Sequence, residues 1–520
     1  MHHPSLTRRD LLKSAAALPL LGLGASASQS SPKANVILFI TDQERAIQHF
    51  PVGWEARNLP GLTRLRSRGL SFGRAYTNAC MCSPARSTLM SGYFPAQHGV
   101  KYTLERDMPA NKFPQVELST SFKNIGTVMA AAGYNVIYKG KWHCSKPAQG
   151  ANAQAARFVQ KDLERYGFQR WNPPDAGANQ DPSEAGGGNA DNDGRFMNED
   201  GQWKAGKEGV LPFLDWVAKS QQPFFLIISL VNPHDVLFYP KNFATSGYPE
   251  SMLAGDIQVP ETNSERLDTK PTAQRDFLAI TDAGMGVLHD DPSRRAYLNF
   301  YGNLMKQADG YLQQVMSALD QLGLTNDTIV IRTADHGEMG LAHRGQRQKN
   351  FNFYEEACRV PLVYSNPRLY DRAYATDALV SHVDFLPTLA SLFHAPVSAR
   401  ANWQGVDYSR IVLNPGAAPV QDYLVFTYDD YQSGQSGGVS PFPPNRIVSI
   451  REARFKLAEY YDPAGQAESQ WEMYDLLNDP LEVENIAWPT YVRTQAQQLE
   501  LDRLRAKLAA VKATRLRPLV

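Results

Sequence analysis

Short apolar runs alternate with helical patterns along most of this chain, and this alternation constrains the fold more than any other sequence feature. The first run, at 35–40, is rich in β-branched residues, which is typical of a buried strand. Similar runs recur at 134–138, 224–230, 328–332 and 360–364. Helical patterns lie between them, for example at 121–132 and 295–322. The sequence therefore predicts an α/β fold with a large, mostly parallel central sheet flanked by helices.

The composition changes near 414–419, after the last of these runs. Beyond this point come strand-like segments at 424–428, 446–451 and 456–461, and a charged helical segment at about 494–515. With 520 residues, the chain is long enough for more than one core. We expect a larger domain at 33–415 and a smaller C-terminal α+β domain at 420–520, with an antiparallel sheet and a terminal helix.

The charges of the chain are balanced. Lysine plus arginine and aspartate plus glutamate each count 53, so the formal net charge is zero. A balanced chain gives no support for nucleic-acid binding or for a polybasic membrane surface. We therefore expect no nucleic-acid partner.

The N-terminus has the pattern of an export signal. Arg8 and Arg9 form a twin-arginine motif at 7–13, an apolar run follows at 15–23, and residues 25–27 resemble a cleavage site. The apolar run is too short to span a bilayer, so we expect no stable membrane anchor. These features predict a twin-arginine signal peptide at 1–27, export by the Tat machinery, and a periplasmic or secreted protein. The alternative is a basic N-terminal tail.

Polar residues follow four of the predicted strands. They are Asp42 and Gln43, Lys141 and His143, Asn232 and His234, and Asp335 and His336. Ligands of open α/β sheets bind outside the carboxyl ends of the strands. The four strands are therefore predicted to deliver these side chains to one polar site.

Cys82 lies in the segment that carries the strongest chemical signal. Pro84 suits the first turn of a helix, which places Cys82 at the helix N-terminus, where backbone N–H groups and the helix dipole favour an anion. Arg86 follows about one turn later, so the thiol or its derivative is well placed as a nucleophile. The alternative is a structural cysteine on a helix cap. Cys80 and Cys82 are too close for an easy mutual disulfide, and the spacing of the four cysteines is not that of a zinc site.

The segment Cys82-Ser83-Pro84-Ala85-Arg86 resembles the Cys-x-Pro-x-Arg signature of type I sulfatases, within the alkaline phosphatase superfamily. The resemblance extends from about residue 35 to residue 487 and includes the C-terminal motif at 473–480. It implies an alkaline-phosphatase-like fold and hydrolysis of sulfate monoesters of a sulfated carbohydrate or of a small or aryl sulfate. It also implies that a formylglycine-generating or sulfatase-maturing enzyme converts Cys82 to Cα-formylglycine, whose hydrate attacks sulfur.

The resemblance further implies a divalent metal site. Its ligands would be Asp42, Gln43, the group derived from Cys82, Asp335 and His336. Such an oxygen-rich set suits a hard cation, for which Ca²⁺ is the expectation. Gln43 and His336 depart from the Asp and Asn found in many sulfatases and resemble choline-sulfatase-like and phosphonate monoester hydrolase branches, which makes Mn²⁺ the alternative.

The remaining catalytic residues are also implied by the resemblance. Arg86, Lys141 and Lys349 would supply positive charge to the sulfate oxygens. His143 would act as the base when the covalent intermediate collapses, and His234 would be the general acid for the leaving group. The spacing from Lys349 to the Arg359-Val360-Pro361 segment is one residue longer than in some relatives.

Two other functions are compatible with these residues, namely a phosphonate monoester or phosphodiester hydrolase on the same scaffold, and a non-catalytic glycan-binding relative with an unmodified cysteine. Sulfated carbohydrate, aryl sulfate and choline sulfate all remain open as substrates.

The stretch at 145–209 is rich in Gly, Asn and Asp and is expected to be a solvated loop bordering the substrate. The aromatic and acidic stretch at 428–431 is a candidate for shaping the substrate pocket.

Overall fold

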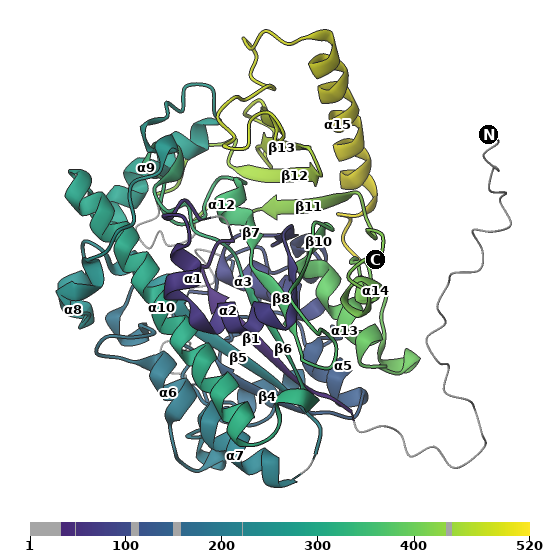
Figure 1. Cartoon of the computed structure of the whole chain (residues 1–520). Coiled ribbons are helices and arrows are strands. Elements are labelled where there is room, and N and C mark those ends of the chain that lie inside the picture. Colours follow the sequence, from purple (N-terminus) through teal and green to yellow (C-terminus); the bar gives the residue numbers. More distant parts are fainter. Residues whose placement is uncertain are drawn as a thin grey trace, which may run out of the picture. The chain divides into compact units, whose positions relative to one another are not determined.

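A seven-stranded sheet forms the centre of the fold, with the strand order β4-β5-β1-β6-β8-β2-β9 (Figure 1). Its strands are β1 (Asn35–Asp42), β2 (Gly69–Phe72), β4 (Asn135–Gly140), β5 (Phe224–Pro233), β6 (Thr328–Ala334), β8 (Leu362–Ser365) and β9 (Tyr374–Thr376). The neighbours β4, β5, β1 and β6 are parallel, whereas β8 is antiparallel to β6 and to β2. The predicted α/β fold with a mostly parallel sheet is confirmed. The run predicted at 360–364 is interrupted, because it divides into β7 (Arg359–Val360) and β8.

Helices cover both faces of this sheet (Figure 1). Successive side chains of β1 point to opposite faces, so this strand contributes to two hydrophobic cores. Val36, Leu38 and Ile40 belong to a core that includes side chains of α3 (Cys82–Ser91), α5 (Ile125–Ala131) and α13 (Phe385–Leu392). Ile37 and Phe39 belong to a second core with α2 (Pro60–Ser67), α7 (Val210–Ser220) and the long helix α10 (Asp291–Gln321). A strand buried on both faces is expected to be apolar throughout, which explains the continuous apolar run from which β1 was predicted.

The C-terminal part contains a four-stranded antiparallel sheet, ordered β11 (Tyr423–Tyr428), β12 (Arg446–Glu452), β13 (Phe455–Tyr461) and β14 (Gln470–Asp475). The terminal helix α15 (Gln495–Thr514) lies beside this sheet (Figure 1). Its Leu501, Leu504 and Leu508 belong to one hydrophobic cluster with side chains of the sheet. The predicted antiparallel sheet and terminal helix are confirmed. Thr427 donates its N–H to the carbonyl of Asn78 at 2.9 Å, so the sheet is joined to the segment that precedes Cys82.

Shorter elements complete the fold. They are β3 (Ala75–Tyr76) and β10 (Val380–Ser381), which form a three-stranded sheet with β7, and the helices α1 (Trp54–Asn58), α4 (Pro95–His98), α6 (Asn192–Asn198), α8 (Phe243–Ser246), α9 (Thr272–Met285), α11 (Ala342–Gly345), α12 (Glu355–Cys358) and α14 (Ser409–Leu413).

The computed structural model describes residues 33–46, 48–105, 114–148, 158–220, 222–432 and 439–519. The signal peptide predicted at 1–27 lies outside the described residues. Contacts group the chain from Ala34 onward into one compact unit, and the domain boundaries predicted at 415 and 420 stay predictions. Among the described residues, no helix combines the length and apolar character needed to cross a bilayer.

The stretch at 145–209 was expected to be a solvated loop, and this expectation is wrong for much of its described part, although residues 200–205 are exposed. Asp193 is fully buried and accepts the N–H groups of Val231 and Asn232 at 2.7 and 2.9 Å. The glycines at 186–188 lie against Val231, Tyr248 and Ser246 so closely that a Cβ atom would clash. The small and polar residues of this stretch thus serve close packing and the capture of backbone N–H groups rather than solvation.

Candidate active site

The parallel strands of the central sheet deliver polar side chains to one edge. β1 pairs in parallel with β5 and β6, and β5 pairs with β4, so their carboxyl ends lie together. The polar residues predicted from the sequence lie at or just beyond these ends: Asp42 and Gln43 for β1, Lys141 and His143 for β4, His234 for β5, and Asp335 and His336 for β6. All of them are buried. The topology thus brings together residues that lie far apart in the sequence.

Cys82 is the first residue of α3, and Pro84 lies in the first turn, as predicted. The Cys82 side chain is buried, and its Sγ lies 3.7 Å from Asp42 Oδ1 and 3.4 Å from His336 Nε2. Lys141 Nζ lies 3.7 Å from the same sulfur. Both the free N–H groups of the helix N-terminus and the lysine favour negative charge at this position.

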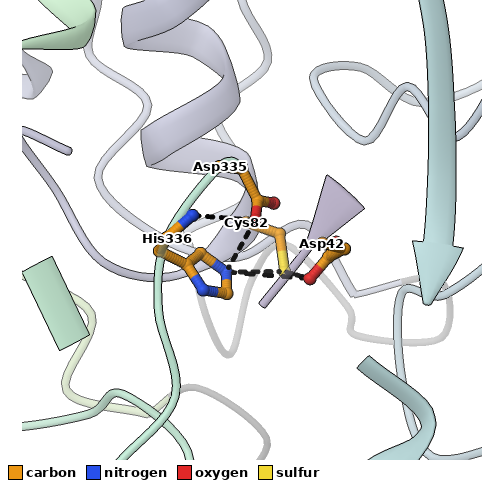
Figure 2. A group of neighbouring side chains, drawn as sticks. All are labelled: Asp42, Cys82, Asp335 and His336. Carbon is orange, nitrogen blue, oxygen red and sulfur yellow. Dashed lines mark hydrogen bonds and ion pairs between the residues drawn. The ribbon is translucent and has the colours of Figure 1, made fainter. Parts of the chain in front are cut away.

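Asp42, Cys82, Asp335 and His336 form a buried group whose ligand atoms all lie within 4.8 Å of one another (Figure 2). His336 Nδ1 lies 3.1 Å from the carbonyl of Gly337. Because a carbonyl only accepts, Nδ1 carries a proton, so Nε2, which faces the carboxylates and the sulfur, is the nitrogen available to a cation. Two carboxylates and an imidazole around a sulfur are a donor set that fits a divalent cation.

Arg86 is buried and connects the two carboxylates of this group. Its Nε donates to Asp335 Oδ2 at 2.9 Å, and its Nη2 donates to Asp42 Oδ2 at 3.1 Å. Its Nη1 donates to Ser229 Oγ at 2.8 Å and to the carbonyl of Lys141 at 3.0 Å. The planar guanidinium therefore fixes the spacing of both carboxylates, which a lysine could not do.

Two buried lysines lie beside this group. Lys141 Nζ lies 2.5 Å from Asp42 Oδ2 and also donates to the carbonyl of Gly177. Lys349 Nζ donates to Gln43 Oε1 at 2.6 Å. Both ammonium groups are held in place by protein acceptors, so their positive charge is positioned before any substrate binds.

His143 and His234 are buried beside Cys82, and each lowers the pKa of its thiol. The backbone of His143 has φ +53°, and its N–H donates to Asp175 Oδ2 at 2.8 Å. His143 Nε2 lies 2.7 Å from the carbonyl of Leu104. Nε2 therefore carries the proton, and Nδ1 is left to accept one.

The pKa values of the site follow from this arrangement. Burial disfavours the thiolate of Cys82, but the cations of Lys141 and Lys349, together with the neighbouring His143 and His234, hold the pKa of the thiol well below its ordinary value. Burial is the main cause that lowers the pKa of His234 to about 4, and Lys141 lowers it further. Burial also opposes the charged form of His143, but the neighbouring Cys82 raises the pKa of the imidazole above its ordinary value. The free site thus stabilises an anion at position 82 and keeps His234 neutral.

Sequence reasoning missed two acidic residues that organise the site. Asp175 accepts the N–H groups of Trp142 and His143, both at 2.8 Å, and so fixes the turn that follows β4. Glu338 is fully buried and accepts from Gln43 Nε2 at 2.5 Å. Glu338 could have been found as the third residue after Asp335, whereas Asp175 lies in the polar stretch that was expected to be solvated.

Comparison with known proteins identifies the family. The family model Sulfatase matches residues 34–395. This chain belongs to the sulfatase family. A second model, described as N-sulphoglucosamine sulphohydrolase, C-terminal, matches residues 344–513 of this sulfatase. The resemblance inferred from the Cys82 segment is thereby confirmed, and the enzyme is a sulfuric ester hydrolase.

Similar proteins cover nearly the whole sulfatase. The Ulvan-active sulfatase of Formosa agariphila is 24% identical over 480 residues, which are 92% of this chain and 81% of that protein. A solved structure of a 2-O GAG sulfatase has a TM-score of 0.67 at 20% identity and covers 92% of both chains. The phosphonate monoester hydrolase of Silicibacter pomeroyi has a TM-score of 0.65 at 21% identity, with 93% of this chain and 96% of that chain covered. The two structures show the fold that the sulfatase shares with them.

Proposed function

We propose that this sulfatase hydrolyses sulfate monoesters of carbohydrates at the site around Cys82. The observation that supports this most is the approach of a carboxylate, an imidazole and an ammonium group to one sulfur, at 3.4 to 3.7 Å. A sulfate ester requires a nucleophile, positive charge at its non-bridging oxygens and a proton for the departing alkoxide. The names of the ulvan-active and 2-O GAG sulfatases support a carbohydrate as the alcohol.

Asp42, Asp335 and His336, with Gln43 and the group at position 82, would hold one divalent cation. When bound, the cation supplies Lewis-acid polarisation of a sulfuryl oxygen. Ca²⁺ suits the carboxylate and amide oxygens, and the imidazole nitrogen of His336 supports Mn²⁺ as the alternative. Elemental analysis of the purified protein decides between the two ions.

Cys82 would be converted to formylglycine, whose hydrate supplies an oxygen nucleophile in place of the thiol. The Cys82-x-Pro84-x-Arg86 motif supports this modification. The surroundings of residue 82 support it too, since the helix N-terminus and Lys141 stabilise an anionic oxygen there as well as a thiolate.

The other residues of the site would orient the ester and move protons. Lys141 and Lys349 would bind its non-bridging oxygens, while Arg86 keeps the two carboxylates apart. The negative charge of a bound sulfate favours the protonated form of His234, which would then donate to the leaving oxygen. His143 Nδ1 would accept a proton from the group at position 82, because Nε2 is committed to the carbonyl of Leu104.

The test combines activity with mass spectrometry. Protein co-produced with a sulfatase-maturing enzyme is assayed against a panel of sulfated saccharides and 4-nitrophenyl sulfate, and the peptide containing Cys82 is weighed. We expect sulfate release that scales with the modified fraction and vanishes in the Cys82→Ala variant. An active protein with an intact thiol would contradict the proposed nucleophile. An intact thiol without activity, in protein from the native host, would favour the non-catalytic glycan-binding function.

A phosphonate monoester or phosphodiester hydrolase is the second candidate. Gln43 and His336 favour it, because they resemble the residues of that branch. Side-by-side kinetics on 4-nitrophenyl sulfate and an aryl phosphonate monoester separate the two functions. A phosphonate preference of several orders of magnitude would overturn the sulfatase proposal.

We also propose that residues 1–27 export the enzyme through the Tat machinery to the periplasm or the medium. The twin-arginine motif at 7–13 supports this proposal. Replacing both Arg8 and Arg9 with Lys should retain the enzyme in the cytoplasm, as measured by cell fractionation, and unchanged export would contradict the proposal.

A further inference from the structure

The C-terminal sheet contributes a buried carboxylate that the proposed reaction does not yet use. Asp430 lies two residues beyond the end of β11, in the aromatic and acidic stretch at 428–431, and is fully buried. Its Oδ2 accepts from both N and Oγ1 of Thr103, each at 2.6 Å. A buried carboxylate that accepts two hydrogen bonds from one residue fixes the backbone and the side chain of that residue together.

The residue after Thr103 contacts the active site directly. Leu104 donates its N–H to Ser83 Oγ at 3.0 Å, and its carbonyl oxygen lies 2.7 Å from His143 Nε2. Ser83 adjoins Cys82 in the first turn of α3, and all of these side chains are buried. The peptide from Thr103 to Leu104 therefore links the carboxylate of Asp430 to the proposed base.

Asp430 is itself held against the segments that form the site. Thr427, on the same strand β11, donates its N–H to the carbonyl of Asn78, four residues before Cys82. The hydroxyl of Tyr428 donates to the carbonyl of Asp430 at 2.7 Å. The ring of Tyr428 lies 5.0 Å from that of Phe351, two residues after Lys349. The carboxylate thus has a defined position relative to the residues around position 82.

Two different contacts hold the backbone and the ring of His143. Asp175 accepts its backbone N–H at 2.8 Å, whereas the carbonyl of Leu104 lies on the ring nitrogen Nε2. A carbonyl next to Nε2 favours the tautomer that carries its proton there, which leaves Nδ1 able to accept. If Leu104 moved away, the other tautomer would become accessible, and its protonated Nδ1 could not accept a proton.

We propose that Asp430 is a positioning residue for the base His143. The inference rests on the proposed function and adds to it a contribution of the C-terminal sheet to the chemistry. Through Thr103, Asp430 keeps the carbonyl of Leu104 on Nε2, so that Nδ1 faces the group at position 82 as an acceptor. The proton transfer to Nδ1 accompanies the release of sulfate, which follows the departure of the alcohol. Loss of Asp430 should therefore slow the release of sulfate and leave the departure of the alcohol unchanged.

The kinetic test uses 4-nitrophenyl sulfate, whose alcohol leaves readily. For mature Asp430→Ala enzyme we expect kcat and KM to fall together, each about 10- to 100-fold, because a misplaced base costs rate only in its own step. The ratio kcat/KM should stay within about twofold, since it reports only the steps up to the departure of the alcohol. A burst of 4-nitrophenol equal to the active-site concentration should precede the slow steady state. An unchanged kcat, or a kcat/KM that falls as much as kcat, would overturn the positioning role.

Matched variants separate this role from a general loss of structure. Asp429 is the neighbouring carboxylate, and it contacts Lys101 Nζ at 3.8 Å and the hydroxyl of Tyr461 at 3.4 Å instead. Asp429→Ala should leave kcat and KM within about twofold. Asp430→Asn keeps an acceptor oxygen for Thr103, so it should lose less activity than Asp430→Ala, and equal losses would contradict the acceptor role.

Hydrogen exchange of the unmodified protein tests the contact without any activity. Peptides that contain Thr103 and Leu104 are followed by mass spectrometry in the unchanged protein and in both alanine variants. We expect these two amides to exchange at least about tenfold faster in Asp430→Ala and at an unchanged rate in Asp429→Ala. This result supports the positioning role even if the mature protein releases no sulfate, and in that case only the proposed function fails. Unchanged exchange in Asp430→Ala overturns the positioning role whatever the activity.

A milder variant keeps the test decisive if Asp430→Ala does not fold. Thr103→Val removes the Oγ1 donor to Asp430 and keeps the N–H donor and the size of the side chain. It should lower kcat and KM together, by a smaller factor than Asp430→Ala, and speed the exchange of the Leu104 amide. A folded Thr103→Val protein with unchanged kinetics and exchange would overturn the proposal.

Discussion

The amide of Gln43 joins Lys349 to Glu338. Its Oε1 accepts from Lys349 Nζ at 2.6 Å, and its Nε2 donates to Glu338 Oε2 at 2.5 Å. A carboxylate can accept from the lysine but cannot donate to the glutamate. This explains why an amide occupies a position where many sulfatases have an acid.

Gln43→Glu should therefore destabilise the protein, because it places a second carboxylate against buried Glu338 and removes a donor. We expect the free energy of unfolding to fall by about 1–3 kcal/mol, the usual effect of losing a buried partner. Urea unfolding of the unmodified protein measures this change. Gln222→Glu, at an exposed position, is the control and should have little effect. Equal stability of both variants would show that the bond to Glu338 contributes nothing.

Arg86→Lys should weaken both metal binding and stability, because one ammonium group cannot reach Asp42, Asp335 and Ser229 together. Breaking a buried ion pair typically costs about 3–5 kcal/mol. Urea unfolding of the unmodified, metal-free protein gives the stability, and titration with Mn²⁺ and Ca²⁺ gives the affinity, so that any effect on maturation does not interfere. Arg165→Lys, at an exposed position, is the control. An unchanged metal affinity would argue against the positioning role of Arg86.

Removal of the metal should lower the melting temperature of the unmodified protein. A ligand that binds only the folded state stabilises it by about 2.7 kcal/mol at a concentration 100 times Kd. Scanning calorimetry after chelation, and after return of Mn²⁺ or Ca²⁺, measures the effect for each ion. Asp335→Asn should reduce the response to added metal. If neither the chelator nor added metal changes the melting temperature, the protein does not have the proposed metal site.

His98 should make the stability depend on pH. It is buried in the neutral form, accepts from the N–H of Val100 at 3.1 Å and lies 3.0 Å from Thr88 Oγ1. Burial, with a smaller contribution from Lys101, lowers the pKa of His98 from 6.5 to about 3. As the pH falls below 6.5, the unfolded chain takes up the proton first, so stability is lost on acidification.

Between pH 7.5 and 5.5 this loss should amount to about 1.4 kcal/mol for His98 alone. Urea unfolding at both pH values is compared for the unchanged protein and for His98→Gln. The variant should lose less stability by that amount, whatever its absolute stability. Identical pH dependence in the two proteins would show that His98 does not titrate in this range.

Much of the fold could be predicted from local patterns. β1, β5 and α10 are long, apolar or amphipathic, and lie close to their predicted bounds. β14 was not predicted as a strand, and β8 was merged with β7, because short strands lack a distinctive period and their direction depends on their neighbours. The C-terminal sheet and α15 were predicted from strand-like segments and a charged helical segment, without their packing partners.

Some residues of the candidate site could be predicted from the sequence, and others could not. Cys82, Lys141, His143, His234 and the two metal-ligand pairs were predicted because each follows a recognisable strand or motif, and the structure brings them together. Asp175 and Glu338 were missed, since nothing in their local sequence shows that they accept buried N–H groups from distant segments. Arg86 was predicted as a sulfate-binding charge, whereas its contacts show a guanidinium shared between Asp42 and Asp335.

The sequence by itself determined the class of fold, the family and the types of side chain at the candidate site. Strand patterns and short motifs depend only on residues that are close together in the sequence. Only the tertiary structure decided which groups touch, namely the amide between Lys349 and Glu338 and the guanidinium between two carboxylates. These contacts join residues that can be hundreds of positions apart, and their geometry is set by the parallel register of β4, β5, β1 and β6 and by the docking of β11 beside the Cys82 segment.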